Sequence, residues 1–189
     1  ADETFIEGAL TAYNTANNES VSIATLNGGV DKDRPLVKRG AGLLKMNKPM
    51  SNYSASVFVE GGALRTEVQY SIGKENNDLA PVYVRAGATF TSLTTNTVMN
   101  ANRIFHIAGN GNGTYGAALH CYGNGVPNNY GNTGCLGKTV ILDADATGHV
   151  ESWMFLGSGR LELNGHTLTF LLQESENTDR PGHLPSTIA

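Results

Sequence analysis

The chain has 189 residues, of which 16% are charged and 40% are hydrophobic, and its formal net charge is −4. This length suits one domain with a sizeable core, and the abundance of Gly, Asn, Thr and Ser predicts a folded chain rich in turns. The negative charge argues against binding nucleic acid through the whole surface, because neutralising phosphates requires clustered Lys and Arg. No run approaches the roughly 20 apolar residues of a membrane span, so we expect no transmembrane helix.

The first twenty residues are the best helix candidate in the chain. Apolar residues recur there at the spacing of one helix face, after two acidic residues that suit a helix start. We therefore expect residues 1–20 to form a short N-terminal helical segment. The apolar positions are Phe5, Ile6, Ala9, Leu10 and Tyr13.

Short runs typical of strands fill residues 21–173. Residues 53–60 and 64–72 alternate in polarity on either side of Gly61-Gly62, which predicts a β-hairpin. Residues 160–163 and 167–172 predict a second hairpin around Asn164-Gly165. The stretch DADATG, residues 143–148, is typical of a turn, and the polar residues 174–189 predict an extended C-terminal tail.

The pattern as a whole indicates the fold class. About ten to twelve short strands separated by turns, without alternating helices, are typical of an all-β sandwich. We find no clean internal repeat in the sequence. The prediction is therefore an all-β protein, a β-sandwich or jelly roll spanning residues 21–173, preceded by the short helix.

The stretch from residue 103 to residue 136 carries the candidate binding site. It contains two loops of alternating Gly and Asn, three tyrosines and both cysteines. Amide side chains both donate to and accept from sugar hydroxyls, and tyrosine rings pack on sugar faces. The alternative is that the tyrosines anchor the loops and the Gly/Asn pairs only form turns. The candidate ligand-binding residues are Asn110, Asn112, Tyr115, Tyr122, Asn128, Asn129 and Tyr130.

No catalytic, metal or cofactor site emerges from the sequence. Residues 111–116 match G-x-G-x-x-G, but no helix pattern follows, so we expect no dinucleotide cofactor. His120 and Cys121 would project from opposite faces of a strand and so cannot act together. Cys121 and Cys135 lack the spacing of a zinc knuckle, and a disulfide and two free thiols are equally consistent with the sequence. We therefore predict no catalytic residue, no metal and no cofactor.

The composition of the chain and the spacing of its expected strands resemble those of a known group of proteins. Low charge, many short strands and loops such as GNGNGTYG (109–116) and GNGVPNNYGNTG (123–134) resemble receptor-binding and structural domains of bacteriophage tail fibres, tailspikes and other virion proteins. The two strands around Gly61-Gly62 also resemble strands of carbohydrate-binding jelly rolls. This resemblance implies a non-catalytic structural or receptor-binding component of a virion or an extracellular assembly, which binds cell-surface polysaccharide.

Two other functions are consistent with the sequence, and the sequence also predicts an assembly state. The protein could instead be a viral capsid or decoration protein whose loops make lattice contacts, or a polysaccharide-active enzyme whose carboxylates the sequence does not single out. The apolar run 153–156, together with the N-terminal segment, offers more apolar surface than one small sandwich needs. We therefore expect a homo-oligomer, with a trimer favoured, no nucleic-acid partner and no membrane span.

Overall fold

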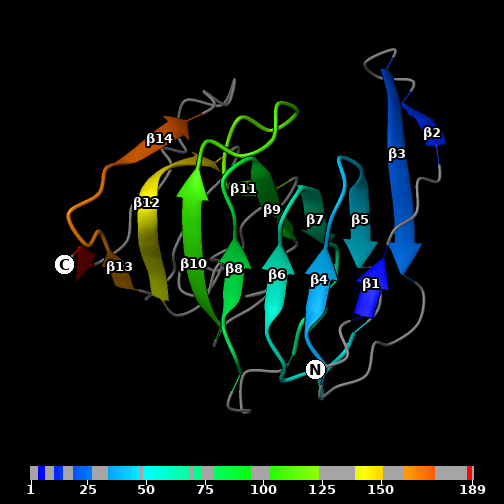
Figure 1. Cartoon of the computed structure of the whole chain (residues 1–189), viewed down its shortest axis with the longest axis horizontal. Helices are drawn as coiled ribbons and strands as arrows, with labels where there is room; N and C mark the ends of the chain where they lie inside the picture. Colours follow the sequence, from blue (N-terminus) through cyan, green and yellow to red (C-terminus); the bar gives the residue numbers. More distant parts are fainter. Residues whose placement is uncertain are drawn as a thin grey trace.

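The computed structural model is a parallel β-solenoid (Figure 1). The chain winds in successive coils, and each coil adds one strand to each of two facing sheets. Because the strands of one sheet are separated in sequence by a whole coil, they run parallel. The structure describes residues 4–6, 11–14, 19–26, 34–46, 49–68, 70–73, 79–94, 103–123, 139–150, 160–172 and 187–188.

The first sheet is the one that lies in front in Figure 1. Each of its strands pairs in parallel with the strands of the coils before and after it. β12 is long enough to pass through both sheets, and its first residues belong to this one. In order, the strands are β1 (Thr4–Ile6), β4 (Leu36–Lys38), β6 (Val57–Val59), β8 (Val82–Val84), β10 (Ile104–Gly109), β12 (Thr139–Val150), β13 (Arg160–Glu162) and β15 (Thr187–Ile188).

The second sheet lies behind the first and is built in the same way. The end of β12 joins β11 to β14 in this sheet. At the opposite edge, β2 (Thr11–Asn14) pairs antiparallel with the first strand, β3. The parallel strands are β3 (Glu19–Leu26), β5 (Leu43–Met46), β7 (Gly62–Thr66), β9 (Ala88–Thr94), β11 (Leu119–Gly123), β12 and β14 (Leu168–Leu172).

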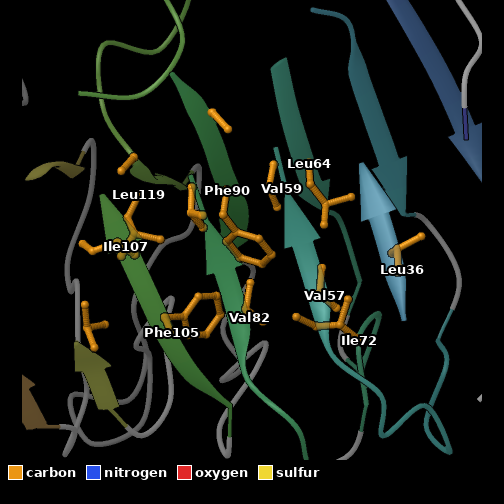
Figure 2. Packing of buried hydrophobic residues seen from close by; sticks show 14 of the residues in the cluster. Leu36, Val57, Val59, Leu64, Ile72, Val82, Phe90, Phe105, Ile107 and Leu119 are labelled. Atoms are coloured by element: carbon orange, nitrogen blue, oxygen red, sulfur yellow. The ribbon is translucent and has the colours of Figure 1, made fainter. Parts of the chain in front are cut away.

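The core consists of apolar rows that run along the stack of coils (Figure 2). Equivalent residues of successive coils lie side by side, so each inward position repeats as a row. Phe90 of the second sheet meets Phe105 of the first edge-on, with ring centroids 5.0 Å apart. One fully buried row of the first sheet comprises Leu36, Val57, Val82, Phe105, Val140 and Leu161.

A buried arginine, Arg103, links the turns that connect the strands of successive coils. Arg103 is completely buried, and its guanidinium donates to the backbone oxygens of Ile72 and Ala55, each at 2.7 Å. It also donates to the backbone oxygens of Ala80 and Tyr53 and lies 5.3 Å from the Tyr53 ring. One side chain therefore satisfies four carbonyl groups in two connections, β5 to β6 and β7 to β8, and so ties these two turns together.

Tyr53 extends this network to the first sheet. Its hydroxyl accepts a hydrogen bond from Leu36 N at 2.8 Å and donates one to Ser56 O at 2.9 Å. Burial raises the pKa of Tyr53 to about 12, and burial lowers the pKa of Arg103 to about 10. At neutral pH the phenol is therefore neutral and the guanidinium charged, which are the forms that these hydrogen bonds require.

A second buried cation lies at the corner after β4. Lys38 is 4% exposed, and its ammonium donates to the backbone oxygens of Arg39, Gly40 and Gly61 at 2.7, 2.7 and 2.9 Å. Burial lowers the pKa of Lys38 to about 8. Lys38 therefore contributes to the fold through these hydrogen bonds.

The predicted sandwich and jelly roll are wrong, and so is the predicted N-terminal helix. Within residues 1–20 the structure places β1, β2 and the start of β3, not a helix. β1 pairs in parallel with β4, from Thr4 beside Leu36 to Ile6 beside Lys38. A single short helix is only marginally stable on its own, whereas a strand gains backbone hydrogen bonds from a neighbour already in place.

Both predicted hairpins are also wrong, because their strands belong to different sheets. β6 pairs with β4 and β8, whereas β7 pairs with β5 and β9. β13 and β14 are likewise divided between the two sheets. The predicted turn at 143–148 lies inside β12, which bends from one sheet to the other.

Candidate functional site

Three of the predicted site residues lie in the loop of residues 110–118, between β10 and β11. Asn110 Oδ1 accepts a hydrogen bond from Thr147 Oγ1 at 2.9 Å, and Asn112 Oδ1 accepts one from Tyr115 N at 3.2 Å. These bonds tie the loop to β12 and close it on itself. Both amide oxygens therefore have partners within the protein before any ligand arrives.

The structure does not describe the side chains of the other four predicted residues. Tyr122 belongs to β11, but its side chain lies outside the described residues. Asn128, Asn129 and Tyr130 lie outside the described residues altogether. A role for these four in binding stays a prediction.

The 110–118 loop packs onto the outer face of the second sheet. The Tyr115 ring lies 5.0 Å from the His120 ring, and Arg65 Nη2 donates to Tyr115 Oη at 3.4 Å. His120 Nδ1 is 3.0 Å from Thr91 Oγ1, and the His149 ring lies 4.9 Å from the His120 ring. His120 is only 3% exposed. The loop thus makes this part of the face a second packed layer, with His120 closed off from solvent.

The Gly/Asn composition of the loop has a steric cause. Gly111 has a φ of 73°, and a Cβ on it would lie 1.9 Å from Ala117 O. Below it, Thr89 Oγ1 donates to Ala117 O at 2.7 Å and accepts from Asn112 N at 3.0 Å. Only glycine permits this close approach of the two loop segments.

His120 and Cys121 do lie on opposite faces of β11. Cys121 points into the core, where it is 2% exposed and has a free thiol, while His120 faces the loop. The imidazole therefore cannot activate this thiol as a nucleophile. Cys135 lies outside the described residues. Within the part of the chain that the structure describes, no group of three or more His, Cys, Asp or Glu side chains could hold a metal ion.

The outer face of the first sheet carries a row of half-buried aromatic side chains, which we call the aromatic row: Phe58, Tyr83 and His106. They occupy equivalent positions of successive coils, and adjacent ring centroids are 4.9 Å apart. The Phe58 and Tyr83 planes differ by 8°, and the Arg85 guanidinium lies 5.7 Å from the Tyr83 centroid. Because the rings stack on one another, the row presents mainly ring edges to the outside.

Sequence reasoning missed this row, although a signal for it exists. Each ring is the middle residue of a short unit flanked by apolar residues: VFV at 57–59, VYV at 82–84 and FHI at 105–107. Successive side chains of a strand point to opposite faces, so the two apolar neighbours point into the core while the ring points outward. The units are unevenly spaced, so a search for a fixed period does not find them.

Two polar pairs lie at the aromatic row or beside it. Arg39 Nε lies 2.6 Å from Glu60 Oε2, at the corner where the first sheet ends. Two coils further on, His106 Nδ1 lies 2.9 Å from Asp143 Oδ1. These side chains are partly exposed, so each pair contributes little to stability. They give the face alternating hydrogen-bond donors and acceptors.

The aromatic row leads to a shallow, open depression of about 570 Å³, which we call the end depression. His106 lies beside Ile141 in the register, and Ile141 lies beside Glu162. The line of outward side chains thus continues from the rings to β13. The end depression is lined by Arg160, Glu162, Leu163, Asn164, Gly165 and His166.

The wall of the end depression is a tight turn held by hydrogen bonds. Asn164 and Gly165 have φ values of 50° and 79°, the left-handed conformations that suit an Asn-Gly turn. Asn164 Nδ2 donates to Leu142 O at 3.3 Å, and His166 N donates to Leu163 O at 2.8 Å. The polar side chains therefore stand on a backbone of fixed shape, which lowers the entropy cost of binding.

The polar groups around the end depression lie close to one another within the protein. Arg160 Nε lies 3.4 Å from Glu162 Oε1, and His166 Nδ1 lies 3.8 Å from Asp145 Oδ1. Asp145 Oδ1 also accepts a hydrogen bond from Thr167 N at 2.8 Å. A guanidinium, two carboxylates, an amide and an imidazole thus meet beside one apolar side chain.

No family model matches the chain, and no curated protein or solved structure matches it either. The fold defines it as a parallel β-solenoid with one open, polar and aromatic face. No helix in the described part of the chain is long and apolar enough to cross a membrane.

Proposed function

We propose that this protein is a non-catalytic, glycan-binding component of a virion or an extracellular assembly. The observation that carries the proposal is the continuous outer surface of the first sheet, where the aromatic row leads to the end depression. Glycan sites combine polar side chains that bond to hydroxyls with an apolar patch for the C–H groups. The end depression has this combination, with Leu163 as the apolar member.

The two parts of the surface play different roles in this proposal. The ring faces of Phe58 and Tyr83 are occupied by one another, so a sugar does not stack on them as it would on an isolated tyrosine. Their edges and the adjacent polar pairs, Arg39–Glu60 and His106–Asp143, contact the sides of an extended chain. The end depression holds one sugar residue of that chain, because the donors and acceptors converge there.

A glycan array followed by calorimetry tests the proposal. We expect the purified protein to bind at least one extended glycan, and Arg160→Ala and His166→Ala each to weaken that binding by 10-fold or more. Lys45→Ala on the second sheet is the matched control and should leave the affinity unchanged. All three variants should keep the melting temperature of the parent. A protein that binds no glycan on the array, or variants that bind as well as the parent, would contradict the proposal.

The assembly state remains part of the proposal. A homo-oligomer, with a trimer favoured, would present several copies of the face and raise the avidity for a polysaccharide surface. Sedimentation at micromolar concentration tests this: a monomer there would reject the oligomer, without bearing on the binding face itself.

A further inference from the structure

The charge balance of the end depression bears on which class of sugar fits there. The one arginine that lines it, Arg160, is already paired with Glu162. Asp145, next to His166, has a side chain that is 76% exposed. Arg160, Glu162 and Asp145 together bring one formal positive charge and two negative charges. A sugar that carries a carboxylate or sulfate would therefore meet carboxylates without a cation of its own.

The same groups suit the hydroxyls of an uncharged sugar. A carboxylate such as that of Glu162 accepts hydrogen bonds from two neighbouring hydroxyls, and a guanidinium donates to their oxygens. The bond from Asn164 Nδ2 to Leu142 O fixes the plane of the Asn164 amide at the wall. Leu163 offers a surface for the C–H groups of the ring. Contacts of this kind leave the Arg160–Glu162 ion pair intact.

We infer that the end depression selects an uncharged sugar residue with neighbouring free hydroxyls and discriminates against acidic sugars. This inference rests on the proposed function and specifies the ligand of the same site. It predicts a weak dependence on ionic strength as well, because no net charge is neutralised when the ligand binds.

The test compares matched oligosaccharides that differ only in charge: a neutral chain, its uronate-containing counterpart, a sulfated counterpart and one with free amines. We expect the neutral chain to bind at least 10-fold more tightly than the acidic ones, with less than a twofold change in Kd between 50 and 500 mM salt. Binding confined to charged chains would overturn the inference and leave glycan binding standing. If no chain of any class binds, both the inference and the proposed function fail.

Glu162→Gln sharpens the test by changing the charge and little else. The substitution keeps the size of the side chain and releases Arg160 from its carboxylate partner. We expect the affinity for the uronate-containing chain to rise fivefold or more relative to the parent, while the melting temperature stays the same. An unchanged preference for the neutral chain over the acidic one would show that charge balance does not set the specificity and would overturn the inference.

Discussion

Charged side chains play opposite roles inside this solenoid and on its outer face. Arg103 and Lys38 are buried and donate to backbone carbonyls of the turns, whereas Arg39 and Arg160 pair with carboxylates on the first sheet. A buried cation that fixes carbonyl groups cannot be removed without leaving those groups unpaired. An exposed pair can be removed at little cost, because water replaces each partner. The comparison separates residues that hold the fold from residues whose loss the fold should tolerate.

We expect the largest loss of stability from a substitution at Arg103. Arg103→Met removes the donor to four backbone carbonyls in two turns, so we expect the free energy of unfolding to fall by at least about 3 kcal/mol. Urea denaturation measures it. Arg103→Lys is the control that keeps the charge without the planar fork, and it should recover only part of the loss. A loss below about 1 kcal/mol for Arg103→Met would mean that water can replace the guanidinium.

Gly62 should rank second, because it shapes the corner that Lys38 stabilises. It has a φ of 61°, and a Cβ there would lie 2.4 Å from Gly42 O and 2.5 Å from Gly40 O. Gly62→Ala should therefore cost about 2 kcal/mol or more, from left-handed strain together with the clash. Gly113→Ala is the matched control, since no atom lies within 4 Å of a Cβ at that position. Equal melting temperatures for the two variants would contradict this account of the corner.

For Lys38 we expect a smaller effect on stability, and one that depends on pH. Burial lowers the pKa of Lys38 to about 8, below the usual 10.5. Between these two pH values the unfolded chain therefore binds more protons than the folded chain does. The stability of the parent relative to Lys38→Met should therefore rise between pH 8 and about 10, by at most about 1.4 kcal/mol per pH unit. Chemical denaturation of both proteins at several pH values measures the difference. A difference that stays flat or falls with pH would show that burial does not disfavour the ammonium.

The smallest effect on stability should come from the outer face. Arg39→Ala removes the 2.6 Å pair with Glu60, but both side chains are about a third or more exposed. We expect a change within about 0.5 kcal/mol, in contrast to the loss at Arg103. A loss above about 2 kcal/mol would place Arg39 with the residues that hold the fold.

Local structure in this chain was easier to predict than strand pairing. Short strands such as β8, β9 and β10 do occur within residues 21–173, and Asn164-Gly165 does turn the chain. The turn signals, however, fit a hairpin and a solenoid corner equally well. Gly61-Gly62 reverses no strand here, because β6 and β7 pair with other coils. Pairing across a whole coil depends on register, which local sequence does not contain.

For the candidate site, too, local features could be predicted from the sequence, whereas contacts between coils could not. The sequence drew attention to the Gly/Asn loops, and the amides of Asn110 and Asn112 prove to be bonded within the protein. The aromatic row was missed because Phe58, Tyr83 and His106 come together only once the coils are stacked. The outward position of each ring could have been predicted from the alternation within its strand, but its neighbours could not.

Stacking the coils also makes the molecule mechanically anisotropic. The hydrogen bonds between neighbouring strands point along the axis of the stack, whereas the covalent chain runs across it. A pull along the axis therefore loads only the non-covalent contacts between one coil and the next, which can open one at a time. A pull across the axis is borne by peptide bonds within each coil. Under tension along its length the molecule should lengthen in small steps, and it should be stiff in the other direction.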